Sequence, residues 1–339
     1  MVHLRIVVPS YQAEHTLDLL KSAPSVCNVV YLERVAHRPE GDLILCDVAR
    51  EDASVIVSDL RELNIDKEGS ISMEMIDSQI SAAAVASEKA AAGLPSDAVV
   101  WEEVESRTSE NVELSASFLA FMVLAMLIAM VGILTDQIIL IIGAMIVGPE
   151  FGPIAGICVA AVEKRRDLFK RSFKALAIGF PVGITATFLI ALLFNAVGLV
   201  PDGFSDRDHP FTQFIAAPDQ WSVIVAYLAG VAGVLSLTSA KSGALIGVLI
   251  SVTTIPAAAN IGLAAALGDW HEWVGAMAQL SLNLGAILLA GIGTLFIQRH
   301  LYIRRRRAHL HDEARVAAGL PIGRSRRVGS ATYKSPDGA

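Results

Sequence analysis

The sequence predicts an N-terminal α/β domain followed by an α-helical membrane domain, because apolar and charged residues are unevenly distributed along the chain. Of its 339 residues, 53% are hydrophobic, which exceeds the roughly 45–50% of soluble domains. Residues 1–113 are acidic, with 9 Lys and Arg against 21 Asp and Glu; residues 114–298 are mostly apolar; residues 299–339 are basic, with 10 against 3. We therefore expect a cytoplasmic head (1–78), a helical connector (79–113), a membrane domain (114–298) and a basic, disordered cytoplasmic tail (299–339).

The head alternates between strand-like and helix-like segments. Strand-like runs cover His3–Val8, Val26–Leu32, Leu43–Val48 and Gly69–Ile76, and a turn is expected at Gly41-Asp42. Helical spacing of apolar residues covers Ala13–Ser22 and Ala53–Leu63. The resulting βαββαβ order predicts a ferredoxin-like sandwich with one open sheet face. Such a domain is either a small-molecule sensor or a structural dock for the membrane part, and the sequence leaves both open.

The connector is predicted to contain two helices. The first covers the Ala-rich stretch from Asp77 to Ala92 and ends at Gly93-Leu94-Pro95, and Ser96 caps the second.

Six apolar segments of about 20 residues follow, which is the length that a membrane span needs. They cover residues 114–134, 138–161, 174–199, 221–238, 243–267 and 273–297. Basic connectors, including Lys241 and Arg304–Arg307, alternate with acidic ones. The positive-inside rule then places both termini in the cytoplasm of a protein of the inner (plasma) membrane, with Trp221, Trp270 and Trp273 at the outer ends of their spans.

Two of these spans carry residues that break helices. The second reads GAMIVGPEFGPIAG and the fifth reads SGALIGVLISVTTIP, and each opens with Gly-Ala and reaches a proline in mid-span. Each is the middle member of a group of three, and the two run in opposite directions, so the pattern predicts a 3+3 inverted repeat with broken helices. The predicted solute or ion pathway comprises Gly148, Pro149, Glu150, Gly152, Pro153, Ser251, Thr253, Thr254, Pro256 and Asn260. The alternative is that the polar members only hold neighbouring helices together.

Glu150 is the acidic residue that this assignment places deepest in a span. A charge at that depth costs about 2.5–3.5 kcal/mol on insertion scales. We expect this carboxylate to face a cavity, carry a proton or pair with a cation. The alternative is that it lies nearer to water, or caps a half-helix.

The two broken segments, with the basic loop between them, resemble the bacterial and archaeal "uncharacterised hydrophobic domain" membrane proteins, a domain-of-unknown-function family, over roughly residues 80–300. The resemblance implies an integral membrane protein in which a small α/β cytoplasmic domain precedes several helices, and it supplies no activity or substrate. Similar sequences more often have an apolar residue in place of Glu150, within a Ser-Pro-Leu-Met-Gly-Pro-like run. Here the run is Gly-Pro-Glu-Phe-Gly-Pro, so Glu150 is a candidate for a variant specificity rather than for a family-wide mechanism.

Other patterns argue against catalysis and nucleic-acid binding. The sequence has no serine elbow, zinc signature, Gly-rich phosphate loop or basic-aromatic surface, and Cys27, Cys46 and Cys158 lack metal-ligand spacing. His309 and His311 stand two apart in the tail without a second ligand pair. We expect no enzyme activity, cofactor, metal or nucleic-acid partner. The basic stretch Arg299–Arg307 is expected to be a topology anchor, and Arg304–Arg307 within it is also suited to anionic lipid. Residues beyond Leu310 are expected to be disordered.

These observations predict secondary transport or channel-like passage of a small polar solute or ion between the two broken spans. The second hypothesis is a membrane-anchored sensor or scaffold whose head binds a small effector or partner without transport. The lipid bilayer is the expected partner in both cases, and the head is a candidate contact for a homo-oligomer.

Overall fold

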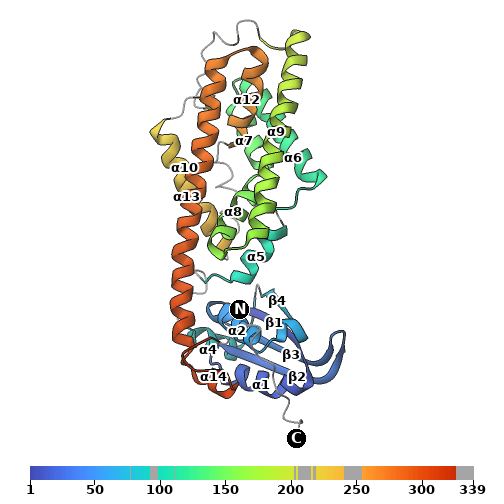
Figure 1. Cartoon of the computed structure of the whole chain (residues 1–339), viewed down its shortest axis with the longest axis vertical. Coiled ribbons are helices and arrows are strands. Elements are labelled where there is room, and N and C mark those ends of the chain that lie inside the picture. The colour runs from blue at the N-terminus through green and yellow to red at the C-terminus, as the bar shows by residue number, and fades with distance from the viewer. Residues whose placement is uncertain are drawn as a thin grey trace. The chain divides into compact units, whose positions relative to one another are not determined.

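The computed structural model describes residues 1–76, 78–91, 98–110, 112–201, 204, 215–216, 219–239 and 254–325. Figure 1 shows its helices and strands. The chain divides into two compact units. The head unit comprises Met1–Glu102 together with His300–Ala339, and the membrane unit comprises Glu103–Arg299.

The head unit is built on a small antiparallel sheet of four strands. In chain order these are β1 (Val2–Val8), β2 (Val26–His37), β3 (Glu40–Val48) and β4 (Ser70–Met75), and they lie side by side as β2-β3-β1-β4. The helices are α1 (Ala13–Ser22), α2 (Arg50–Glu62) and the short α3 (Ile65–Glu68), with a 3-10 turn η1 at Ser10–Gln12. The predicted strands and the two predicted head helices are thus all found; α1 has the predicted bounds, and the ends of the other elements are shifted.

The prediction of a turn at Gly41-Asp42 is wrong. β2 continues to His37, and Gly41 pairs with Ala36 inside the ladder, so the chain reverses at Arg38-Pro39. Asp42 holds this longer hairpin together, because its carboxylate accepts hydrogen bonds from the Tyr31 hydroxyl at 2.7 Å and the Arg34 backbone N–H at 2.9 Å.

Alternation along β1 creates the head core. Val2, Leu4, Ile6 and Val8 are buried with apolar residues of α1 and α2, while Arg5 on the opposite face is exposed. Residues of opposite parity point to opposite faces of a strand, so one sheet face packs against helices.

The tail does not have the disorder predicted beyond Leu310. Helix α13 (Trp270–His309) reaches His309, and α14 (Glu313–Ala317) follows and packs against α1. Ala314, Ala318 and Leu320 join the head core. We call residues 305–325 the C-terminal strap. The expectation failed for residues 311–325 because this segment adds apolar residues to the head core and the buried Arg315 to ion pairs with the head. Residues 326–339 lie outside the described part.

The connector contains α4 (Ala82–Ala90) and α5 (Trp101–Glu110). α4 begins later than predicted because the Ser81 side chain accepts a hydrogen bond from the Ala84 backbone N–H at 3.3 Å and caps the helix there. The predicted stop at Gly93-Leu94-Pro95 and the cap at Ser96 lie outside the described residues.

The membrane unit is helical. Its elements are α6 (Ala116–Leu134), α7 (Ile138–Val147), α8 (Phe151–Glu163), α9 (Arg166–Ala196), α10 (Gln220–Thr238), α12 (Thr254–Leu267) and the long α13 (Trp270–His309), drawn in orange in Figure 1. Among the described residues, α6, α9, α10 and α13 are long and apolar enough to cross a membrane, and α7 with α8 forms a fifth, bent candidate. These helices indicate a multi-pass membrane protein. The predicted span 243–267 is represented by α12 alone, because residues 240–253 lie outside the described part.

Candidate functional site

The second predicted span is interrupted in the structure. α7 ends at Val147, and Gly148 closes it by donating its N–H to the Ala144 carbonyl at 3.0 Å. α8 starts at Phe151 at an angle of 51° to α7. Gly152 and Pro153, which were predicted to belong to the solute or ion pathway, lie in the first turn of α8. A proline is tolerated there because the first N–H groups of a helix have no partner within it.

The Glu150 side chain is buried at this bend, with 3% of its surface exposed. Its Oε1 accepts a hydrogen bond from the Thr254 hydroxyl at 2.9 Å, and Thr254 is the first residue of α12 and is fully buried. Its Oε2 is buried and has no hydrogen-bond partner among the described residues. The two segments that sequence analysis singled out, about a hundred residues apart, therefore meet at one carboxylate.

The backbone at the bend also packs closely against α12. A Cβ atom placed on Gly148 would lie 2.7 Å from Cγ1 of Ile255, which is itself fully buried, and would meet Oε2 of Glu150. The absence of a side chain at Gly148 permits this approach.

The remaining predicted site residues are less closely grouped. Pro256 is buried in α12. Asn260 is buried, and its amide donates to Glu272 Oε2 at 3.0 Å in the first turn of α13, so it bonds to a different carboxylate from Thr254. Ser251 and Thr253 lie outside the described residues.

α8 and α12 have parallel designs. Each contains a proline, Pro153 in α8 and Pro256 in α12. Each is followed after two residues by a long helix, α9 or α13.

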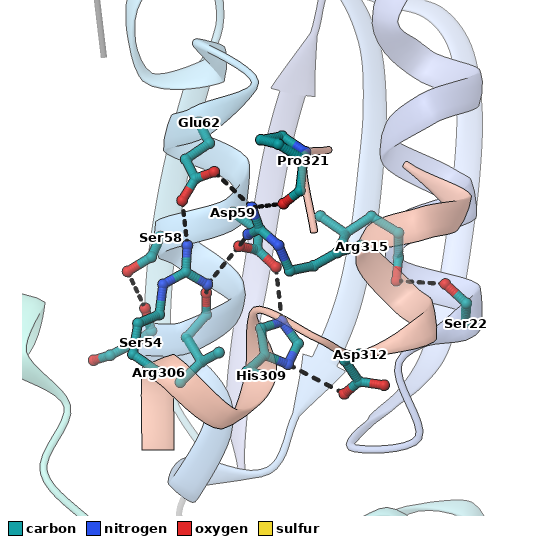
Figure 2. Close-up of polar contacts among 12 residues, drawn as sticks. Ser22, Ser54, Ser58, Asp59, Glu62, Arg306, His309, Asp312, Arg315 and Pro321 are labelled. Carbon is teal, nitrogen blue, oxygen red and sulfur yellow. Dashed lines mark hydrogen bonds and ion pairs between the residues drawn. The ribbon is translucent and has the colours of Figure 1, made fainter. Parts of the chain in front are cut away.

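A charged cluster in the head was not foreseen from the sequence. Asp59 on α2 is fully buried and accepts from Arg306, from Arg315 and from His309 Nε2 at 2.7 Å, as Figure 2 shows. Glu62, one turn later, is paired with both arginines. Burial by itself raises the pKa of Asp59, and the His309 hydrogen bond with the two guanidinium charges outweighs this effect, so the pKa lies below its usual value. The sequence feature that could have indicated this cluster is the basic tail of a chain whose N-terminal domain is acidic.

A pocket of about 310 Å³ lies beside this cluster. Its charged and titratable lining residues are Asp52, Arg305, His309, His311 and Asp312. In the part of the chain that the structure describes, no group of three or more His, Cys, Asp or Glu residues is arranged to hold a metal ion.

The structure divides the arginine run proposed to meet lipid. Arg306 is paired with Asp59 and Glu62, and Arg305 donates to the Glu51 carbonyl at 2.7 Å. Arg304 and Arg307 are exposed.

Comparison with known proteins places the bend within a recognised family segment. Residues 145–289 match the family model "Domain of unknown function (DUF389)". This confirms the resemblance drawn from the Gly-Pro segment, and the DUF389 match includes both Glu150 and Thr254. An uncharacterized protein of Methanocaldococcus jannaschii is 28% identical over 194 residues, which is 57% of this chain and 58% of the relative, so less than two thirds of the relative is spanned. No solved structure gives a significant match.

Proposed function

We propose that this chain is a six-span protein of the inner (plasma) membrane that passes a small polar solute or ion, by secondary transport or as a channel. The observation that carries the proposal is the buried Glu150 carboxylate at the α7–α8 bend, hydrogen-bonded to Thr254 at the start of α12. The pathway would run between these two interrupted segments. The proposal includes no enzymatic reaction, cofactor or metal.

The energetics of an apolar span support this choice. A bend alone requires only glycine and proline, whereas a buried carboxylate adds a cost of about 2.5–3.5 kcal/mol at the bilayer centre. Irregular backbone at membrane depth is tolerated where protein buries it or where it lines a water-filled cavity. The first turn of α8 also offers N–H groups, which favour negative charge. A carboxylate at such a place, with one oxygen that no described residue hydrogen-bonds, is suited to bind or exchange a small ion.

The parallel design of α8 and α12 supports a 3+3 inverted repeat. Each belongs to the middle segment of its group of three, contains a proline and is followed after two residues by a long helix, and these features agree with repeat-related half-helices. The proposed inverted topology assigns opposite directions to these two segments.

The proposed orientation places both termini in the cytoplasm, from the distribution of Lys and Arg. The strand order β2-β3-β1-β4, with α1 and α2 in the two crossovers, supports a ferredoxin-like head. Within the basic run, the exposed Arg304 and Arg307 are the residues proposed to meet anionic lipid. A homo-oligomer joined through the head remains part of the proposal.

Cysteine accessibility tests the pathway. Single cysteines at Pro149 and Pro256, in a background lacking the three native cysteines, should react with a charged, membrane-impermeant reagent. Leu189→Cys is the control, because this apolar residue of α9 is 57% exposed on a candidate span and is expected to face lipid. Protection of both break positions from both sides of the membrane, in protein that remains folded, would refute a pathway at this site.

Ligand binding is tested by thermal stability of the full chain in detergent, with a panel of small solutes and ions. A ligand of the native state stabilises it by RT ln(1 + [L]/Kd), about 2.7 kcal/mol at a hundredfold excess. A shift present in the wild type and absent in Glu150→Gln would assign the ligand to the bend.

The second candidate function is a sensor without transport, which the pocket in the head favours. In that case the shift should persist in Glu150→Gln and disappear in a variant of the pocket, such as His311→Ala. The same panel therefore separates the two functions.

A further inference from the structure

The C-terminal strap is held on α2 by a balanced set of charges. Arg306 and Arg315 face Asp59 and Glu62, so two cations meet two carboxylates. Asp59 and Arg315 are fully buried, and Glu62 is nearly so. A buried charge is costly unless it is paired. This set therefore fixes where the strap docks.

The imidazole of His309 lies between two carboxylates, those of Asp59 and Asp312. Its Nε2 lies 2.7 Å from Asp59 Oδ2, and its Nδ1 lies 3.2 Å from Asp312 Oδ2. Figure 2 shows the ring between these two carboxylates. A neutral imidazole has one N–H and one bare nitrogen, whereas the protonated ring donates from both nitrogens. Only the protonated ring satisfies both contacts at once.

We propose that His309 is a proton-operated latch, which holds the strap on α2 when the imidazole is protonated and loosens it when the ring is neutral. The proposal concerns the head unit alone and does not depend on transport. Loss of the proton leaves a bare nitrogen facing a carboxylate, so one of the two contacts is given up. The positive charges of Arg306 and Arg315 already balance the negative charges of Asp59 and Glu62. When His309 loses its proton, the negative charge of Asp312 is therefore the one left without its cationic partner.

The groups around His309 support a response to solvent pH. α2 contributes Asp59, Glu62 and Asp52, and α14 contributes Arg315. From α13 and the turn after it come Arg305, Arg306, His311 and Asp312. The Ala23–Ser25 loop and Ala90 of α4 line the same pocket with uncharged groups. Histidine is the side chain that ordinarily changes charge between pH 5 and 8, and His309 faces a solvent-open pocket, so protons can reach it.

Hydrogen exchange of the full chain in detergent, read by mass spectrometry, tests the latch. The reporters are strap amides with defined acceptors: Leu320 donates to the Arg315 carbonyl at 3.0 Å, and Gly323 to the Leu310 carbonyl at 2.9 Å. Amides of β1 and β3 are the internal reference for head stability. Rates at pH 6 and pH 8.5 are corrected for intrinsic exchange with an unstructured peptide.

In the wild type, strap protection relative to the sheet should fall about tenfold from pH 6 to pH 8.5, the effect of losing one charge-assisted hydrogen bond. His309→Gln should show weak strap protection at both pH values. His311→Gln is the matched control, since His311 lines the same pocket but is exposed, and it should follow the wild type. Equal protection at both pH values in the wild type, or an unchanged pH response in His309→Gln, would overturn the proposal.

If His309→Gln also weakens the sheet, Asp312→Asn decides. An asparagine amide donates to a bare Nδ1 as readily as its carbonyl accepts from a protonated one, so neutral His309 is no longer penalised. The pH response of the strap should then shrink to less than half of the wild-type change in protection. A full response in Asp312→Asn would overturn the latch.

Discussion

A single methyl group at Gly148 should disturb the contact between the bend and α12. In Gly148→Ala the new Cβ would lie 2.7 Å from Ile255 Cγ1 and would also meet the Glu150 carboxylate. Ile255 is fully buried, and movement of Glu150 strains its bond to Thr254. Overpacking of this kind costs about 1–3 kcal/mol. The φ angle of Gly148 is −63°, which alanine adopts readily, so the cost comes from packing and not from the backbone.

Gly143→Ala is the matched control on the same span. Gly143 lies inside α7, and a Cβ there meets nothing within 4 Å. Alanine is favoured over glycine in a helix by about 1 kcal/mol, so this variant should be neutral or stabilising. The two variants have the same chemistry and opposite expected signs.

Thermal unfolding of the purified protein in detergent measures both variants. A change of 1 kcal/mol shifts Tm by about 2–4 °C in a domain of this size. Gly148→Ala should therefore lower Tm by several degrees. Ile255→Ala lowers Tm as well, because it leaves a cavity at a fully buried side chain. In an Ile255→Ala background, however, Gly148→Ala should cost less than in the wild type, because the atoms that the new methyl meets are gone. A Tm for Gly148→Ala equal to or above that of Gly143→Ala would refute the close approach of the bend to α12.

Thr254→Val should cost about 1–3 kcal/mol, because it removes the hydroxyl that donates to the buried Glu150 carboxylate. Thr135→Val, at an exposed hydroxyl, should change stability by less than about 0.5 kcal/mol in the same thermal assay. Arg315→Met should weaken strap docking by about 3–5 kcal/mol, since it leaves Asp59 buried with one cation fewer; hydrogen exchange of the strap measures this, and wild-type protection would contradict it. The lowered pKa of Asp59 means that its stabilising effect is complete above the ordinary carboxyl pKa of about 4 and is lost as the pH falls through the lowered value. An acid titration of strap exchange should show this loss, and the step should be absent in Asp59→Asn.

The elements of the head could be predicted from the sequence because their signals are local. Alternation in Val2–Val8 has a period of two, and the helical stripe of α2 has a period near 3.6, so each segment reports its own structure. The hairpin turn was misplaced because its position depends on a cross-strand bond between Tyr31 and Asp42, which no local pattern reveals.

The bend could be predicted for a similar reason. Proline and glycine act on the backbone of their own segment, so Gly148-Pro149 marks the interruption without any knowledge of neighbours. The meeting of Glu150 with Thr254 was anticipated only through the symmetry of the two broken spans. Asn260, like Thr254, was predicted as a site residue because it is a polar residue near the proline of the fifth predicted span. Its amide donates to Glu272 and not to Glu150, so proximity in sequence to the break does not determine which carboxylate a side chain contacts.

The order of the C-terminal strap could not be predicted from local sequence patterns. Residues 311–325 mix Arg, Gly, Ser and Pro with apolar residues and show no regular apolar period, and this pattern led to the prediction of a disordered tail. The strap is ordered by interactions with residues more than 240 positions earlier in the chain. Arg315 can be buried because it pairs with Asp59 and Glu62 of α2. A charge excess of one sign at the N-terminus and of the other at the C-terminus was visible from the start. The opposite net charges indicate that the two parts attract each other, but they do not indicate which carboxylates are buried. The docking position of the strap is fixed by the buried ion pairs, which net charge does not reveal.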